Sequence, residues 1–77
     1  MRSLSTIAYE IAHLWPNPYF GAVPYLSAMQ SLDNCKDNYG YDSGKSIVLY
    51  FLSNATKWKG DDARRIKAEL KQHAGVR

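Results

Sequence analysis

The sequence predicts an all-α fold, with residues 1–77 forming one small domain built as a bundle of about four short helices. Apolar residues recur at helical spacing in four separate stretches of the chain. Proline, glycine and short polar residues separate those stretches. A chain of 77 residues buries a small core, and its single cysteine, Cys35, cannot form an intramolecular disulfide. Its stability must therefore come from helix packing.

The first two helices are expected on either side of a connector rich in proline and aromatic residues. Ser3 is the expected N-cap of a helix over residues 4–15, and Pro16 ends that helix. Pro24 fits the first turn of a second helix, which is expected to end around Asp33. The apolar face of the first helix holds Leu4, Ile7, Ala8, Ile11, Leu14 and Trp15. The second helix presents Tyr25, Ala28, Met29 and Leu32 on one face.

The third helix is expected from about residue 43 to residue 56, with Asp42 or Ser43 as its cap. So apolar a helix is expected to be the central one of the bundle. Its Ile47-Val48 start leaves a buried strand as the alternative, which the length of the segment disfavours. Its apolar arc consists of Ile47, Val48, Phe51, Leu52, Ala55 and Trp58, with Leu49 and Tyr50 beside it.

The fourth helix is expected to begin after Gly60 and to end before Gly75. Asp61 and Asp62 fall in its first turn, where the helix dipole favours negative charge. Its inward residues are expected to be Ala63, Ile66, Leu70 and Ala74.

The stretch YGYDSGKS at residues 39–46 ends with the letters that close a P-loop, but it does not meet the P-loop pattern. Only three residues separate Gly40 from Gly44, and Tyr39 stands where the pattern requires glycine. A P-loop also follows a strand of a multi-stranded sheet, for which a small helical chain has no room. Residues 44–46 could hold an anion at a helix start. Capping of those amides by a side chain is the preferred interpretation.

We expect no catalytic site, no metal ion and no cofactor, so the chain is not predicted to be an enzyme. Cys35 has no histidine near it in sequence, and His13 and His73 lie sixty residues apart without zinc-ligand spacing. The aspartates of the loop at residues 33–42 lack the spacing of a calcium loop and are read as solvated turn residues.

The basic residues are concentrated in the second half of the chain. Residues 1–44 carry a net charge of −2 and residues 45–77 carry +5. The third and fourth helices with the turn at Gly60 resemble a helix-turn-helix, which makes a DNA-binding regulator the alternative function. Asp61 and Asp62 argue against it, because they would repel phosphates. The residues of this alternative are Lys57, Lys59, Arg64, Lys67 and Lys71.

Aromatic residues are too numerous to be fully buried in so small a core. They are either anchors of a protein–protein interface or plugs at the bundle ends whose hydroxyl groups reach water. A homodimer that hides them would satisfy both interpretations. The predicted protein-binding residues are Tyr19, Phe20 and Tyr25 of the connector region, with Tyr39 and Tyr41 of the following loop.

Two stretches, PYFGAVPYLSAM at residues 18–29 and YGYDSGKSIVLYFLSNATKWKGDDARRIKAELK at residues 39–71, carry a resemblance to known sequences. Together they resemble small uncharacterised proteins encoded by actinobacterial phages and prophages. The resemblance implies a phage-borne accessory protein that acts on its host. It implies no activity, cofactor or functional residue.

The leading hypothesis is a non-enzymatic binding module that contacts another protein, with a host protein as the expected partner. A lone thiol and the lack of a signal-like segment predict a cytoplasmic location. No stretch is apolar enough to predict a membrane-spanning helix.

Overall fold

The computed structural model describes residues 2–40 and 42–75 and shows four helices and one small sheet within them. The expectation of a mainly helical small domain is confirmed, and the two short strands are an addition to it. The elements are α1 (Leu4–Leu14), α2 (Val23–Met29), β1 (Asn38–Tyr39), β2 (Asp42–Ser43), α3 (Gly44–Ser53) and α4 (Asp61–Ala74).

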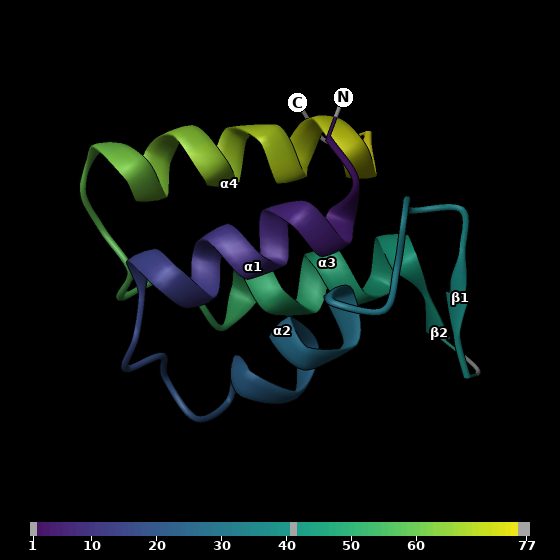
Figure 1. The fold of residues 1–77 in the computed structure, drawn as a ribbon, viewed down its shortest axis with the longest axis horizontal. Coiled ribbons are helices and arrows are strands. Elements are labelled where there is room, and N and C mark those ends of the chain that lie inside the picture. The colour runs from purple at the N-terminus through teal and green to yellow at the C-terminus, as the bar shows by residue number, and fades with distance from the viewer. Residues whose placement is uncertain (1, 41, 76–77) are drawn as a thin grey trace.

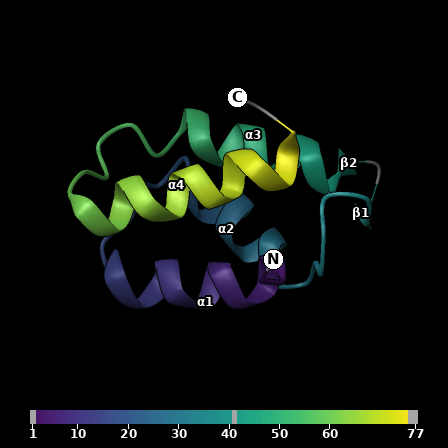
Figure 2. The same ribbon diagram turned by 90° about the horizontal axis from the view of Figure 1, so that it is seen from above.

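Each helix packs against two others, so the four surround one core. α1 contacts α2 and α4, and α3 contacts the same two helices. Figure 1 shows α4 lying across the top with α1 below it, while α2 forms the opposite edge. Figure 2, from above, shows the start of α1 and the end of α4 at the same end of the molecule as the β1–β2 hairpin.

Most core residues are those that the helical spacing predicts, but Ala22 and Leu26 are buried without having been predicted to face inward, and Tyr25 is only partly buried. Every apolar residue expected to face inward from α4 is buried, and Phe51 of α3 is the largest fully buried side chain. Leu14, Trp15, Tyr25 and Leu52 are only partly buried and pack against the core edge. The buried set is Leu4, Ile7, Ala8, Ile11, Ala22, Leu26, Ala28, Met29, Leu32, Ile47, Val48, Phe51, Ala55, Trp58, Ala63, Ile66, Leu70 and Ala74.

Two tryptophans close the core at the end away from the hairpin. The rings of Trp15 and Trp58 stack nearly parallel, with centroids 5.6 Å apart and planes 8° apart. Trp15 also meets Phe51 edge-on at 6.4 Å. Such aromatic pairs add about 0.5–1.5 kcal/mol beyond the area that they bury. The stack therefore joins the end of α1 to the segment between α3 and α4.

The start of α1 is capped both by its own sequence and by a distant loop. The Ser3 side chain accepts a hydrogen bond from the Thr6 amide, as the sequence predicts. The Leu4 amide donates to the Asp33 carbonyl at 2.9 Å, and the Ser5 amide donates to the Leu32 carbonyl at 2.8 Å. These bonds satisfy amides that have no partner inside the helix.

The second helix is shorter than predicted, because it ends at Met29 instead of near Asp33. The Ser31 and Leu32 amides bond three residues back, which makes a tighter turn after the helix. This turn frees the carbonyls of residues 32 and 33 to cap α1. Pro24 lies in the first turn of α2, as the sequence predicts.

The amides of the Gly-Lys-Ser stretch are occupied, but the predicted side-chain cap accounts for the Ser46 amide alone, and the other two bond to backbone carbonyls. The Gly44 amide donates to the Asp37 carbonyl at 2.6 Å, and the Lys45 amide donates to the Cys35 carbonyl at 3.1 Å. The Ser46 amide donates to the Ser43 side chain, which is the N-cap. These three bonds leave no open amide nest for an anion.

The third segment is helical, so the strand alternative is wrong, but the helix ends at Ser53 instead of residue 56. The Asn54 side chain donates to the Tyr50 carbonyl at 2.9 Å and thereby satisfies the helix end. Ala55 and Trp58 are buried from turns that follow the helix. α3 borders the core in the same way as the other three helices and is not enclosed by them, because its Lys45 and Tyr50 side chains are exposed.

The hairpin was not predicted from the sequence. Asn38 pairs with Ser43 and Tyr39 with Asp42 in an antiparallel ladder. Gly40 has a φ of 63°, a left-handed conformation that glycine adopts without strain. Strands of two residues offer no alternation of apolar and polar residues to read, so they resemble a polar loop in the sequence.

α4 begins and ends where predicted. Asp61 and Asp62 occupy its first turn, and Lys71 and His73 occupy its last. Gly75 ends the helix with a φ of 73°, the left-handed conformation common after helices. Among the described residues, no helix combines the length and the apolar character needed to cross a membrane.

Gly44 lies against the backbone of the preceding loop, and this contact gives a testable prediction. A methyl group there would stand 2.7 Å from the Asn34 carbonyl oxygen and 2.9 Å from the Cys35 Cα. We expect Gly44→Ala to lower the free energy of unfolding, because overpacking costs about 1–3 kcal/mol whereas the gain in helix propensity is at most about 1 kcal/mol.

Urea denaturation followed by circular dichroism measures this change. Lys45→Ala is the matched control at the next, exposed position and should change stability by less than about 0.5 kcal/mol. A Gly44→Ala protein as stable as the wild type would contradict the close approach.

Candidate functional site: an aromatic face and a basic cavity

Two aromatic pairs lie near the surface, one in the connector after α1 and one between α2 and α3. Tyr19 and Phe20 pack together with ring centroids 4.7 Å apart, and Phe20 is 79% exposed. Tyr25 of α2 packs on Tyr50 of α3 at 5.4 Å, and Tyr50 is 48% exposed. We call these four residues, Tyr19, Phe20, Tyr25 and Tyr50, the aromatic face.

Asn54 links the two aromatic pairs. It lines a cavity of about 300 Å³ together with Tyr19, and its side chain donates to the carbonyl of Tyr50. Gly21 allows this approach, since a methyl group there would stand 2.7 Å from the Tyr19 ring and 2.8 Å from the Asn54 side-chain oxygen. The connector is thereby held against the end of α3.

The structure separates the aromatic residues that the sequence grouped into one surface. Tyr19 and Phe20 pack on each other and Tyr25 packs on Tyr50, but Tyr39 lies in the β1–β2 hairpin, at the opposite end of the molecule from the connector (Figure 1). Tyr41 lies outside the described residues. Sequence reasoning did not identify Tyr50 as a surface residue. Its spacing places it beside the apolar arc of the third helix, and spacing alone does not show whether another element covers that position.

The basic residues of the DNA-binding alternative also divide into groups. Lys57 lines the cavity beside Tyr19. Lys71 is exposed on α4. Lys59, Arg64 and Lys67 line a second cavity of about 300 Å³, whose other walls are Trp58, Gly60 and Ala63. We call this second cavity the basic cavity.

Lys67 is partly buried, whereas the other two cationic residues of the basic cavity are exposed. Its Nζ donates to the carbonyl oxygen of Trp58 at 2.5 Å and lies 5.9 Å from the centroid of the Trp58 ring. Burial lowers the pKa of Lys67, and the positive charges of Lys71 and Lys59 lower it further. Burial is the larger cause, and the part due to Lys71 and Lys59 reflects the positive charges around Lys67.

The arrangement of α3 and α4 differs from that of a helix-turn-helix. Residues 54–60 separate the two helices, whereas a helix-turn-helix uses a turn of about three or four residues. In Figures 1 and 2 the two helices run in opposite directions side by side, instead of crossing steeply. The basic flank is therefore not presented in the way of a recognition helix.

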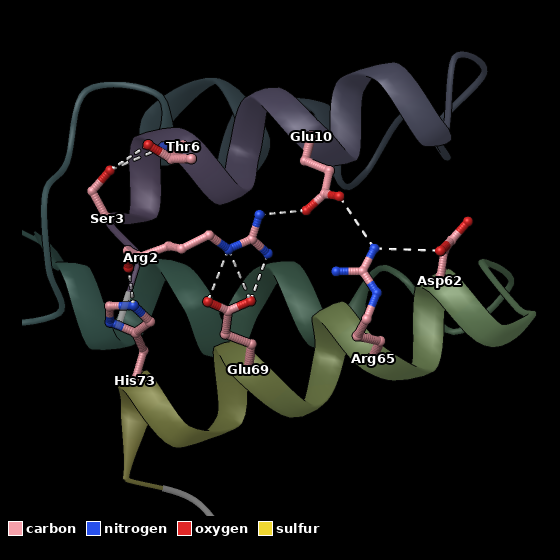
Figure 3. A network of polar contacts seen from close by, with 8 residues as sticks. All are labelled: Arg2, Ser3, Thr6, Glu10, Asp62, Arg65, Glu69 and His73. Carbon is pink, nitrogen blue, oxygen red and sulfur yellow. Dashed lines mark hydrogen bonds and ion pairs between the residues drawn. The ribbon is translucent and has the colours of Figure 1, made fainter.

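A network of ion pairs fastens the start of the chain to α4, and sequence reasoning missed it. Arg2 donates to Glu10 at 2.6 Å and to Glu69 at 2.6 Å (Figure 3). Arg65 donates to Glu10 and to Asp62 at 3.1 Å and 3.3 Å. Hydrogen bonds from Arg2 are the main cause that lowers the pKa of both Glu10 and Glu69.

His73 adds a backbone contact to this network. Its Nε2 lies 2.6 Å from the carbonyl oxygen of Arg2, so Nε2 carries the proton and donates it (Figure 3). Arg2 and Glu69 are 67 positions apart in the sequence. Local spacing carries no signal for a contact at such separation, which explains why the sequence did not reveal it.

The fold brings Cys35 and His73 to the rim of one cavity of about 500 Å³, although they are far apart in the sequence. Burial raises the pKa of the Cys35 thiol, which opposes formation of the nucleophilic thiolate. His73 directs its Nε2 at the Arg2 carbonyl. This pairing lacks an activated nucleophile, so it does not suggest catalysis.

In the loop at residues 33–42, an acidic side chain bonds the backbone. The Asp37 carboxylate accepts hydrogen bonds from the amides of Asp33 and Asn34 at 3.0 Å and 3.2 Å. Within residues 2–40 and 42–75, no group of three or more histidine, cysteine or carboxylate side chains is placed to hold a metal ion.

Comparison with known proteins gives no relative: no family model, no curated protein and no solved structure matches this chain.

The Arg2 network predicts a loss of stability in acid. Glu10 and Glu69 have lower pKa values in the folded chain than when unfolded. Their contribution is therefore present above the ordinary glutamate pKa of about 4.3 and is lost as the pH falls through their folded values. Solvent screens these partly exposed pairs, so each contributes less than about 1 kcal/mol.

Unfolding free energies measured in urea near neutral pH and near pH 3 test this. We expect Arg2→Met, which removes the donor to both carboxylates, to reduce the difference between the two pH values. An Arg2→Met protein with the same acid dependence as the wild type would show that the network does not produce it.

Proposed function

We propose that this chain is a non-enzymatic binding module whose aromatic face contacts another protein. The observation that carries the proposal is the exposure of Phe20, a side chain with no polar atom, which packs on Tyr19. Six large hydrophobic side chains are exposed in the described part of the chain, and Tyr19, Phe20, Val23 and Tyr50 lie in or beside this face. Such clusters mark interaction sites more often than scattered apolar residues do.

The chemistry of the face suits protein contact. Tyrosine and phenylalanine offer large rigid surfaces, and tyrosine adds a hydroxyl group that can bond a partner's backbone. The Tyr25–Tyr50 and Tyr19–Phe20 contacts hold the rings before binding, which reduces the entropy that a partner must offset.

The resemblance to small phage-encoded proteins suggests a host protein as the partner. In that setting the aromatic face would occupy a surface of a larger host protein. A second copy of the chain is the alternative occupant, because a homodimer would also cover Phe20.

A DNA-binding regulator remains the second candidate, favoured by the cluster of Lys59, Arg64 and Lys67 around one cavity. It predicts that log Kd depends linearly on log salt, with a slope near 0.9 per phosphate contacted. The antiparallel course of α3 and α4 makes this candidate weaker than protein binding.

Affinity capture from a nuclease-treated actinobacterial lysate tests the aromatic face. We expect the double variant Phe20→Ser, Tyr50→Ser to lose a discrete protein band that the wild-type chain captures. Removing one interface anchor costs about 2 kcal/mol or more, which weakens binding by about 30-fold. Circular dichroism must show that both chains are equally folded.

Tyr9→Ser is the matched control, since Tyr9 is exposed on α1 and lies outside the face. A Tyr39→Ser variant, measured in parallel, tests whether the hairpin contributes to binding of the captured protein. A band that survives the double variant, or that Tyr9→Ser removes equally, would reject the aromatic face. Recovery of nucleic acid alone, lost after nuclease treatment, would favour the DNA-binding candidate.

A further inference from the structure

We propose that the basic cavity, formed by Lys59, Arg64 and Lys67 beside Trp58, is a binding site for a phosphate group. The phosphate is presented either by a free molecule such as a nucleotide or by a nucleic-acid backbone. This site goes beyond the protein-binding function and uses none of the residues of the aromatic face.

Three cationic side chains converge on this cavity, and its lining contains no acidic residue among those described. Its volume of about 300 Å³ is at the lower end for small-molecule sites. In the described residues no carboxylate pairs with Lys59 or Lys67. Among the described residues the charges of Lys59 and Lys67 therefore have no counterion, whereas Arg64 pairs with Asp61.

Lys67 is positioned before any ligand binds. One of its three N–H donors is directed to the Trp58 carbonyl, which fixes the ammonium group and leaves two donors for an anion. Trp58 in turn is held by its stack on Trp15. Repulsion from Lys59 and Lys71 adds to the cost of keeping Lys67 charged, and a bound phosphate would relieve that repulsion.

Arg64 supplies the planar donor that suits phosphate oxygens. Its present partner is Asp61, at 3.1 Å, and both side chains are largely exposed, at 82% and 98%. Exposed pairs of this kind are weak, so Arg64 can turn to a phosphate at little cost. Asp61 is then a competitor, and its removal should tighten binding.

The test is a titration of the whole chain with pyrophosphate at constant ionic strength, followed in two-dimensional ¹H–¹⁵N spectra. We expect saturable shifts at the amides of residues 59–67 and at the Trp58 indole. Lys59→Gln and Arg64→Gln should each weaken binding by about 3-fold to 10-fold, and Asp61→Asn should tighten it by about 2-fold to 5-fold.

Lys57→Gln is the matched control. It removes the same charge two residues from Lys59, but Lys57 lines the other cavity. The proposal is overturned if Lys57→Gln weakens binding as much as Lys59→Gln does. It is also overturned if the shifts do not saturate and appear equally at Lys36 and Lys45, which would indicate counterion screening alone.

A second arm with a short DNA duplex identifies the source of the phosphate. If pyrophosphate displaces the duplex and Lys59→Gln weakens both, the site takes a backbone phosphate. If pyrophosphate saturates the site and the duplex does not compete, the ligand is a free phosphate-bearing molecule. Both results support the site. Pyrophosphate binding that Lys59→Gln leaves unchanged would overturn it.

Discussion

The burial of Phe51 is the interaction on which the rest of the structure depends. Its ring is fully buried on α3, and Trp15 packs edge-on against it. Because successive residues of a helix point about 100° apart, an inward Phe51 leaves the preceding Tyr50 on the surface, where it joins the aromatic face. Trp15 also stacks on Trp58, whose carbonyl fixes Lys67. One core side chain thus positions residues of both candidate sites.

Two helices also depend on the loop after α2, because its carbonyl groups cap both of them. Carbonyls of Leu32 and Asp33 bond the start of α1, while those of Cys35 and Asp37 bond the start of α3. Gly44 permits the loop to lie against α3 without a clash. A polar segment that resembles a surface loop in the sequence therefore connects two helices, and the Asp37 carboxylate bonds its backbone.

The sequence predicts the helices well because periodic apolar residues report directly on burial. It also predicts Ser3 and Gly75 as caps and leaves Asp42 or Ser43 for α3, of which Ser43 is the cap, since capping depends on residues a few positions away. It does not predict that Tyr39 lies far from Tyr19, or that Lys57 and Lys59 line different cavities. Those outcomes depend on how the elements pack, and spacing along one element carries no information about packing.

The Arg2 network has a consequence for the topology of the chain. Hydrogen bonds to Glu69 and from His73 hold the start of the described chain beside its end. A short linker could therefore join residue 75 to residue 2 with little displacement of α1 or α4. New ends could then open in the β1–β2 hairpin, whose residues are mostly exposed. The fold is suited to circular permutation, and its helices would keep their neighbours in the altered order.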